Sequence, residues 1–151
     1  MKHNKTLKQS SSSKTRILAY DHVGIRVSNK QRALEFYTAL GFVETVSFPE
    51  YEANEMQSID GVRINLIFNA ANTFKSKNVL LDIPIKYPGI THPAFIVDDL
   101  QQLQHWLESN NITITEGPHA IGPRRIALFI RDPDGNVLEF NQLTQQHPTK
   151  E

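Results

Sequence analysis

DHVGIRVSN, residues 21–29, indicates how this chain is built, because THPAFIVDD, residues 91–99, repeats its pattern later in the chain. Each stretch places a histidine before an alternating apolar run and ends in polar residues that can cap a helix. An apolar stripe at helical spacing follows each one. A pattern that recurs in this way indicates two copies of one structural unit.

A second pair of stretches repeats as well. DGVRINLIF, residues 60–68, and DGNVLEFNQ, residues 134–142, both begin with an Asp-Gly turn and continue as an alternating strand. Each half of the chain therefore predicts a strand, a helix and three further strands. The additional strands are expected at residues 42–48 and 53–59 in the first half, and at 112–118 and 125–131 in the second.

The predicted fold class is α+β, with two paired βαβββ modules in a single domain. Ser28 with Gln31, and Asp99 with Gln102, have the spacing of a capping box at the start of each helix. The predicted boundaries are a tail at 1–15, a domain at 16–144 with module one at 17–68, a linker at 69–89 and module two at 90–143, and a second tail at 145–151.

Composition excludes several classes of function. The 151 residues carry 16 Lys and Arg against 16 Asp and Glu, so a nucleic-acid or anionic-membrane surface is not expected. The chain has no cysteine, which removes disulfides and thiolate chemistry. It has no apolar run of about 20 residues and no secretory signal pattern. These features predict a soluble, cytoplasmic protein.

Strand periodicity brings four polar side chains to corresponding faces of the two modules. Alternation leaves His22 and Asn65 on the less apolar face of module one, and His92 and Glu139 on that of module two. A buried carboxylate is costly unless it is paired or bound to a metal. Two imidazoles and one carboxylate form a common open site for a divalent metal. Asn65 is equally well explained as a fourth ligand or as an ordinary strand asparagine.

Further candidates are weaker. Arg124 and Arg125 are adjacent, so at most one of them faces the site, where an arginine could hold a carboxylate or phosphate. A solvated strand end explains this pair equally well. The remaining candidates for substrate binding are His119 and Tyr51, and those for a catalytic base are Glu52 and Glu55.

The paired modules, the histidine that opens each, and the stretches THPAFIVDDL (91–100) and RDPDGNVLEF (131–140) resemble the vicinal oxygen chelate superfamily. That superfamily includes glyoxalase I, fosfomycin-resistance enzymes, extradiol dioxygenases, methylmalonyl-CoA epimerase and bleomycin-binding proteins. The resemblance covers residues 17–143. It implies a half-barrel cleft in which the first and last strands of each module hold one divalent metal ion.

The resemblance assigns His22, His92 and Glu139 to three metal positions of the family. Asn65 stands at the fourth, where glyoxalase I has a glutamate that takes part in proton transfer, so the resemblance does not extend to that reaction. The implied ion is Mn, Fe, Ni, Co or Zn. A homodimer is also implied, because members of the superfamily often complete the cleft with a second chain.

Two functions follow from the resemblance. The first is a metal-dependent enzyme of the lyase, isomerase or dioxygenase type, which uses the ion to bind and activate a small oxygenated substrate. The second is a non-catalytic protein that holds a small molecule without metal, like the bleomycin-binding proteins. The histidine and glutamate ligands favour the enzyme.

Overall fold

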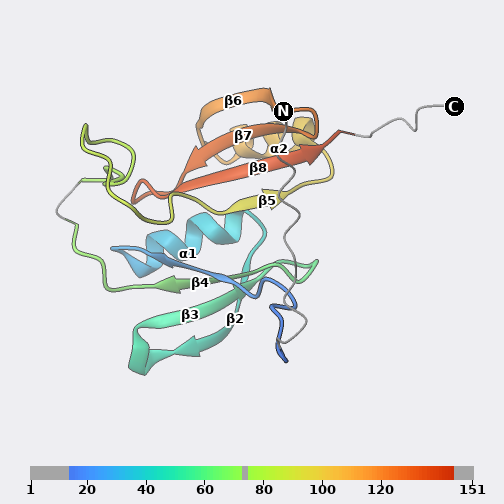
Figure 1. Ribbon diagram of the computed structural model, residues 1–151. Coiled ribbons are helices and arrows are strands. Elements are labelled where there is room, and N and C mark those ends of the chain that lie inside the picture. The colour runs from blue at the N-terminus through green and yellow to red at the C-terminus, as the bar shows by residue number, and fades with distance from the viewer. Residues whose placement is uncertain (1–13, 73–74, 145–151) are drawn as a thin grey trace, which may run out of the picture.

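A computed structural model describes residues 14–72 and 75–144 (Figure 1). It contains two four-stranded sheets, and one α-helix belongs to each. The first sheet has the strand order β1-β4-β3-β2 and the second the order β5-β8-β7-β6. The α+β class and the repeated βαβββ order predicted from the sequence are therefore confirmed.

Both modules place their elements in the same order. In module one these are β1 (Val23–Arg26), α1 (Lys30–Ala39), β2 (Val43–Phe48), the 3-10 helix η1 (Pro49–Tyr51), β3 (Ala53–Gln57) and β4 (Arg63–Ile67). In module two they are β5 (Ala94–Ile96), α2 (Leu100–Ser109), β6 (Ile114–Ile121), β7 (Arg125–Arg131) and β8 (Val137–Leu143).

The first and last strands of each module pair in parallel with the same register. Gly24 of β1 lies opposite Asn65 of β4, and Ala94 of β5 lies opposite Glu139 of β8. The predicted site histidine precedes each of these small residues by two positions. Asn65 and Glu139 are therefore equivalent positions in the two sheets, as the sequence repeat predicts.

The helix starts differ from the prediction in one module. Asp99 caps α2 and accepts a 3.0 Å hydrogen bond from the backbone N–H of Gln102, as expected. The cap of α1 is Asn29, whose side chain accepts from the backbone N–H of Arg32, so the prediction of Ser28 was wrong. Ser28 is unavailable because its hydroxyl and its backbone N–H both donate to the carboxylate of Asp134.

The helices and the buried faces of both sheets form one apolar cluster. Phe42, which follows α1, lies 6.0 Å from Phe95 of β5 between ring centroids, and Phe95 lies 5.6 Å from Phe140 of β8. In Figure 1, α1 lies between β4 of the first sheet and β5 of the second. Burial of this shared surface stabilises the two modules as one unit.

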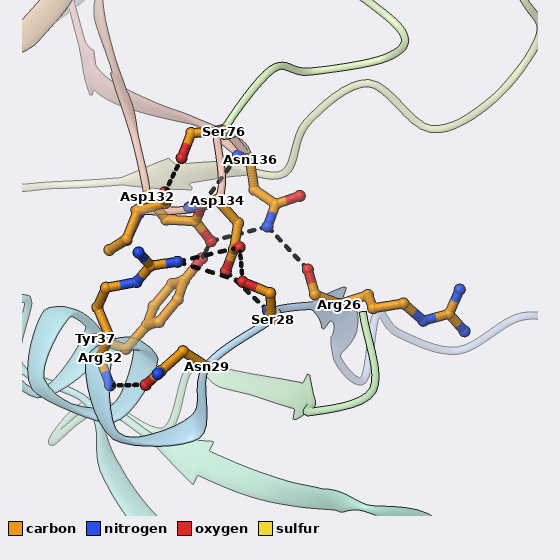
Figure 2. Close-up of polar contacts among 10 residues, drawn as sticks. Arg26, Ser28, Asn29, Arg32, Tyr37, Ser76, Asp132, Asp134 and Asn136 are labelled. Carbon is orange, nitrogen blue, oxygen red and sulfur yellow. Dashed lines mark hydrogen bonds and ion pairs between the residues drawn. The ribbon is translucent and has the colours of Figure 1, made fainter. Parts of the chain in front are cut away.

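Polar contacts also join the modules, at the turn between β7 and β8 (Figure 2). Asp134 in this turn accepts from Ser28 and lies 3.4 Å from Nη2 of Arg32. The side-chain amide of Asn136 donates a 3.0 Å hydrogen bond to the backbone oxygen of Arg26, the last residue of β1. The turn that precedes β8 thus binds the end of β1 and the start of α1.

Most of the two predicted tails, namely residues 1–13 and 145–151, lies outside the described residues. Within residues 14–72 and 75–144, no helix is long and apolar enough to cross a membrane.

Candidate functional site

The candidate site lies on the outer face of the second sheet, by which we mean the face turned away from α2. Leu138 and Phe140 of β8 belong to the apolar cluster that includes α2, so Glu139 between them points to the opposite side. Strand pairing places further side chains beside Glu139. The outer face of the second sheet comprises His92, Ala94, Ile96, Arg125, Ala127, Phe129, Glu139 and Asn141.

His92 and Glu139 meet on this face. The imidazole Nε2 of His92 lies 3.4 Å from Oε2 of Glu139, whose residue is only 5% exposed. Phe129 packs against the imidazole with ring centroids 5.7 Å apart. Nδ1 of His92 shares a 2.9 Å hydrogen bond with the hydroxyl of Thr91. When Nδ1 carries the proton and donates to Thr91, the lone pair of Nε2 is free to bind a metal.

Arg125 approaches the same carboxylate from the other side. Its Nε lies 4.0 Å from Oε1 of Glu139, which is an ion pair beyond hydrogen-bond distance. That Nε is buried and has no hydrogen-bond partner among the described residues. Glu139 therefore lies between an imidazole and a guanidinium, and the positive charge of Arg125 offsets part of the cost of burying the carboxylate.

The His92–Glu139 pair fits two ligands of one metal ion. Two donors bonded to an ion at about 2.1 Å in tetrahedral geometry lie about 3.4 Å apart. Nε2 of His92 and Oε2 of Glu139 have that separation. A third ligand is not supplied nearby, because residues 14–72 and 75–144 contain no group of three His, Cys, Asp or Glu placed to hold a metal.

His22, the third predicted ligand, lies in the other module. Its Nδ1 is 2.6 Å from Oδ2 of Asp21, and this hydrogen bond lowers the pKa of the Asp21 carboxyl. His22 and His92 both line a cavity of about 400 Å³ between β1 and the segment 90–93 that precedes β5. Glu139 does not line that cavity. The structure therefore brings His92 and Glu139 together and leaves His22 outside their pair.

Asn65, the candidate fourth ligand, lies on the corresponding outer face of the first sheet. Its neighbours Ile64 and Leu66 are fully buried in the apolar cluster, so the Asn65 side chain points away from them. Its Oδ1 is buried without a hydrogen-bond partner among the described residues. An unpaired buried oxygen is unusual and is compatible with a ligand that the chain itself does not supply.

The weaker candidates in module two are dispersed. Arg124 is exposed in the turn before β7, where its backbone oxygen accepts from the N–H of Thr144. His119 is on β6, and its Nε2 lies 3.7 Å from Oε1 of Glu116. Neither His119 nor Arg124 has a recorded contact with Glu139 in the described part of the chain, whereas Arg125 does.

The weaker candidates in module one lie around β3. Tyr51 is exposed in η1. Glu52 has a left-handed backbone with φ of 49° and lines a cavity of about 280 Å³ beside Lys30. Glu55 is on β3, and its Oε1 lies 3.7 Å from Nε of Arg63. Their roles as substrate-binding or basic groups stay predictions.

The sequence pattern did not single out Asn141. This residue follows Glu139 by two positions on β8 and therefore shares its face. The same strand alternation that identified Glu139 could have identified Asn141. It is 7% exposed, and its Oδ1 has no hydrogen-bond partner among the described residues. Thr91 was also not predicted, and only the folded structure shows its bond to the imidazole of His92.

Comparison with known proteins agrees with this architecture. The Glyoxalase domain-containing protein RDO1 of Mycosarcoma maydis is 26% identical over 130 residues, which cover 83% of this chain and 68% of that protein. The antibiotic-binding protein TnmS3 from Streptomyces sp. CB03234 has a similar structure, with a TM-score of 0.64 and 20% identity over 86% of this chain and 99% of that one.

A glyoxalase/dioxygenase from Nostoc punctiforme is also similar, with a TM-score of 0.63 and 19% identity over 88% of this chain and all of that one (100%). At this level of identity the two solved structures support the fold alone. The family model described as Glyoxalase/Bleomycin resistance protein/Dioxygenase superfamily matches residues 19–140. With its two βαβββ modules and this match over most of its length, the chain belongs to the Glyoxalase/Bleomycin resistance protein/Dioxygenase superfamily.

Proposed function

We propose that this protein is a divalent-metal-dependent enzyme whose metal site is completed by a second copy of the chain. One chain supplies His92 and Glu139, and its partner supplies His22, with the Asn65 oxygen as a fourth ligand. The observation that carries this proposal is the 3.4 Å pair of His92 and Glu139 on the outer face of the second sheet, which has no third His, Cys, Asp or Glu ligand among residues 14–72 and 75–144 of its own chain.

The equivalent registers of the two sheets support a shared site. Gly24 opposite Asn65 and Ala94 opposite Glu139 give each outer face one histidine and one oxygen donor. Each sheet thus presents half of a ligand set. A two-fold dimer that brings the first sheet of one chain against the second sheet of the other would form two identical complete sites.

The chain's own residues have separate tasks in this site. His92 provides a nitrogen ligand, and the hydroxyl of Thr91 fixes the ring with Nε2 directed at Glu139. Glu139 is the anionic ligand, and Asn65 adds a neutral oxygen. A divalent ion bound there would supply Lewis acidity toward a small oxygenated substrate, in a lyase, isomerase or dioxygenase type of reaction.

Metal titration tests the ligand set. Calorimetric titration of metal-free protein with Mn, Ni, Zn and, without oxygen, Fe(II) should give one site per chain. Glu139→Gln should lose most of the affinity because it removes the anionic ligand. Glu108→Gln is the matched control, since Glu108 is an exposed residue of α2. Equal affinity in wild type and Glu139→Gln would reject the metal site.

A complementation experiment tests the second copy. His22→Ala and Glu139→Gln should each bind metal poorly alone. In a two-fold dimer each mixed pair keeps one of its two sites, so an equimolar statistical mixture should recover about a quarter of the wild-type sites. If all ligands of a site came from one chain, mixing would recover none. Light scattering on the same samples should report a dimer.

A second function, a non-catalytic small-molecule binder, is favoured by one specific contact. Arg125 lies 4.0 Å from Glu139 and gives that carboxylate a counter-charge without any metal. TnmS3, which is described as an antibiotic-binding protein, has a similar fold. If the metal-free protein binds none of the four metals, this binder replaces the enzyme as the assignment.

A further inference from the structure

We infer that Arg125 is a carboxylate-binding residue, so that the ligand of this protein carries a carboxylate next to an apolar body. The inference deepens the proposed function and rests on it for the place of the ligand, the outer face of the second sheet. Its main observation, the unpaired Nε of Arg125, does not depend on the metal, and titrations with benzoate and with metal separate the two proposals.

The side chain of Arg125 lacks a hydrogen-bond acceptor for a buried donor. Its Nε is buried and unpartnered among the described residues, and the nearest carboxylate oxygen, Oε1 of Glu139, is 4.0 Å away. A charged N–H donor usually bonds to a carboxylate at 2.7–2.9 Å. The side chain as a whole is 30% exposed, so an added molecule can contact part of it beside the buried Nε. A ligand oxyanion would supply the acceptor that the chain does not.

Glu139, the negative group nearest to Arg125, also faces His92. Oε2 of Glu139 faces His92 at 3.4 Å, while Oε1 faces Arg125. If Glu139 binds a metal ion as proposed, its negative charge is drawn toward that ion. Arg125 then keeps a positive charge with little compensation at a half-buried position, which favours a bound anion.

The surroundings select the kind of anion. Phe129 lies four residues from Arg125 on the same face of β7, and Ile96 of β5 is 67% exposed on that face. These side chains suit an apolar ligand body. A dianion such as phosphate would bring excess negative charge next to Glu139, whereas a monocarboxylate matches the single guanidinium.

A second unpaired atom supports a built ligand site rather than a chance gap. Oδ1 of Asn141 is also buried without a hydrogen-bond partner among the described residues. Asn141 lies opposite Ala127, and Ala127 follows Arg125 by two positions on β7. Asn141 is 7% exposed. An unpaired donor and an unpaired acceptor therefore occur on one face, which is rare for buried groups in a closed core.

The probe is benzoate, and the control is benzamide, a neutral molecule of the same shape. Binding to metal-free protein is measured by NMR of the arginine Nε–H signals. The signal missing from Arg125→Lys identifies Arg125. Benzoate should shift this signal saturably, and benzamide should not. Arg125→Gln should weaken benzoate binding about tenfold or more, because a charged hydrogen bond is lost. Arg124→Gln, an exposed neighbour, should change it by less than about twofold.

Three results would overturn the inference. The first is equal benzoate affinity in wild type and Arg125→Gln. The second is an Arg125 Nε–H signal that does not shift when benzoate is added up to its solubility limit. The third is a shift of this signal by phosphate that indicates tighter binding than that of benzoate. Backbone spectra of each variant verify folding. Metal titration of Arg125→Gln separates the two proposals. This variant should retain the metal affinity that Glu139→Gln loses. Loss of benzoate binding with unchanged metal affinity identifies Arg125 as the carboxylate-binding residue.

Discussion

The phenol of Tyr37 donates a 2.8 Å hydrogen bond to Oδ2 of Asp132, across the boundary between the two modules (Figure 2). Tyr37 is on α1 and is fully buried, and Asp132 begins the turn before β8. Asp132 also accepts from the backbone N–H groups of Asp134 and Asn136 and from the side chain of Asn136. One carboxylate thus organises the turn and binds it to the first helix.

Removing the phenol should weaken this junction. Tyr37→Phe keeps the ring and its contacts with Phe36 and Phe42, and deletes only the donor. We expect the free energy of unfolding to fall by about 1.5–3 kcal/mol, the range for a hydrogen bond to a charged group. Urea denaturation measures it. Tyr20→Phe is the control, because Tyr20 is 79% exposed and its loss of a hydroxyl should be nearly neutral. Equal effects of the two variants would contradict the prediction.

The stability contributed by Asp132 should depend on pH. Burial raises the pKa of this carboxyl above its ordinary 3.8, although hydrogen bonds from Asn136 and Tyr37 act against the rise. The folded state therefore binds the proton more tightly than the unfolded state. The associated stability is complete below pH 3.8 and is lost as pH rises through the folded pKa. The difference in unfolding free energy, wild type minus Asp132→Asn, should fall as pH increases across this range.

Asp82 should show the opposite sign. Arg131 donates to both carboxylate oxygens of Asp82, at 2.5 and 2.8 Å, and lowers the pKa of Asp82 to about 2. Its stabilising effect is present above pH 3.8 and is lost as pH falls toward 2. The pair lies at the surface, with side chains 26% and 32% exposed, so Asp82→Asn should cost no more than about 1 kcal/mol at neutral pH. Acid titration of unfolding compares it with wild type, and a cost that grows at low pH would reject this account.

Gly135 should be intolerant of a side chain. Its φ is +85°, and a Cβ atom there would overlap the backbone oxygen of Ser76, which belongs to the segment packed on this turn. We expect Gly135→Ala to cost about 2–4 kcal/mol, from backbone strain together with the overlap. Gly122→Ala is the matched control, because Gly122 has φ of +63° with nothing within 4 Å of its Cβ position. The control should lose only about 1–2 kcal/mol of strain, and thermal unfolding of both variants measures the difference.

The sequence alone determined the local order of this protein. The repeat predicted two βαβββ modules, and Asp99 was identified as a helix cap, because capping and strand alternation depend on residues close together in the chain. Alternation also predicted that Asn65 and Glu139 occupy equivalent positions, and the parallel registers with Gly24 and Ala94 confirm it.

The use of those faces depends on contacts that form only when the two modules pack together. Ser28 leaves the helix cap to bind Asp134, 106 residues away, and Arg125 takes a place beside Glu139. His22 immediately precedes β1 of the first sheet, whereas Glu139 is on β8 of the second, and of the two only His22 lines the cavity that it shares with His92. Strand periodicity fixes which side of one sheet a residue occupies, but it carries no information on how two sheets pack. That choice depends on the apolar surface and the hydrogen bonds that both modules bury together, and these exist only in the folded chain.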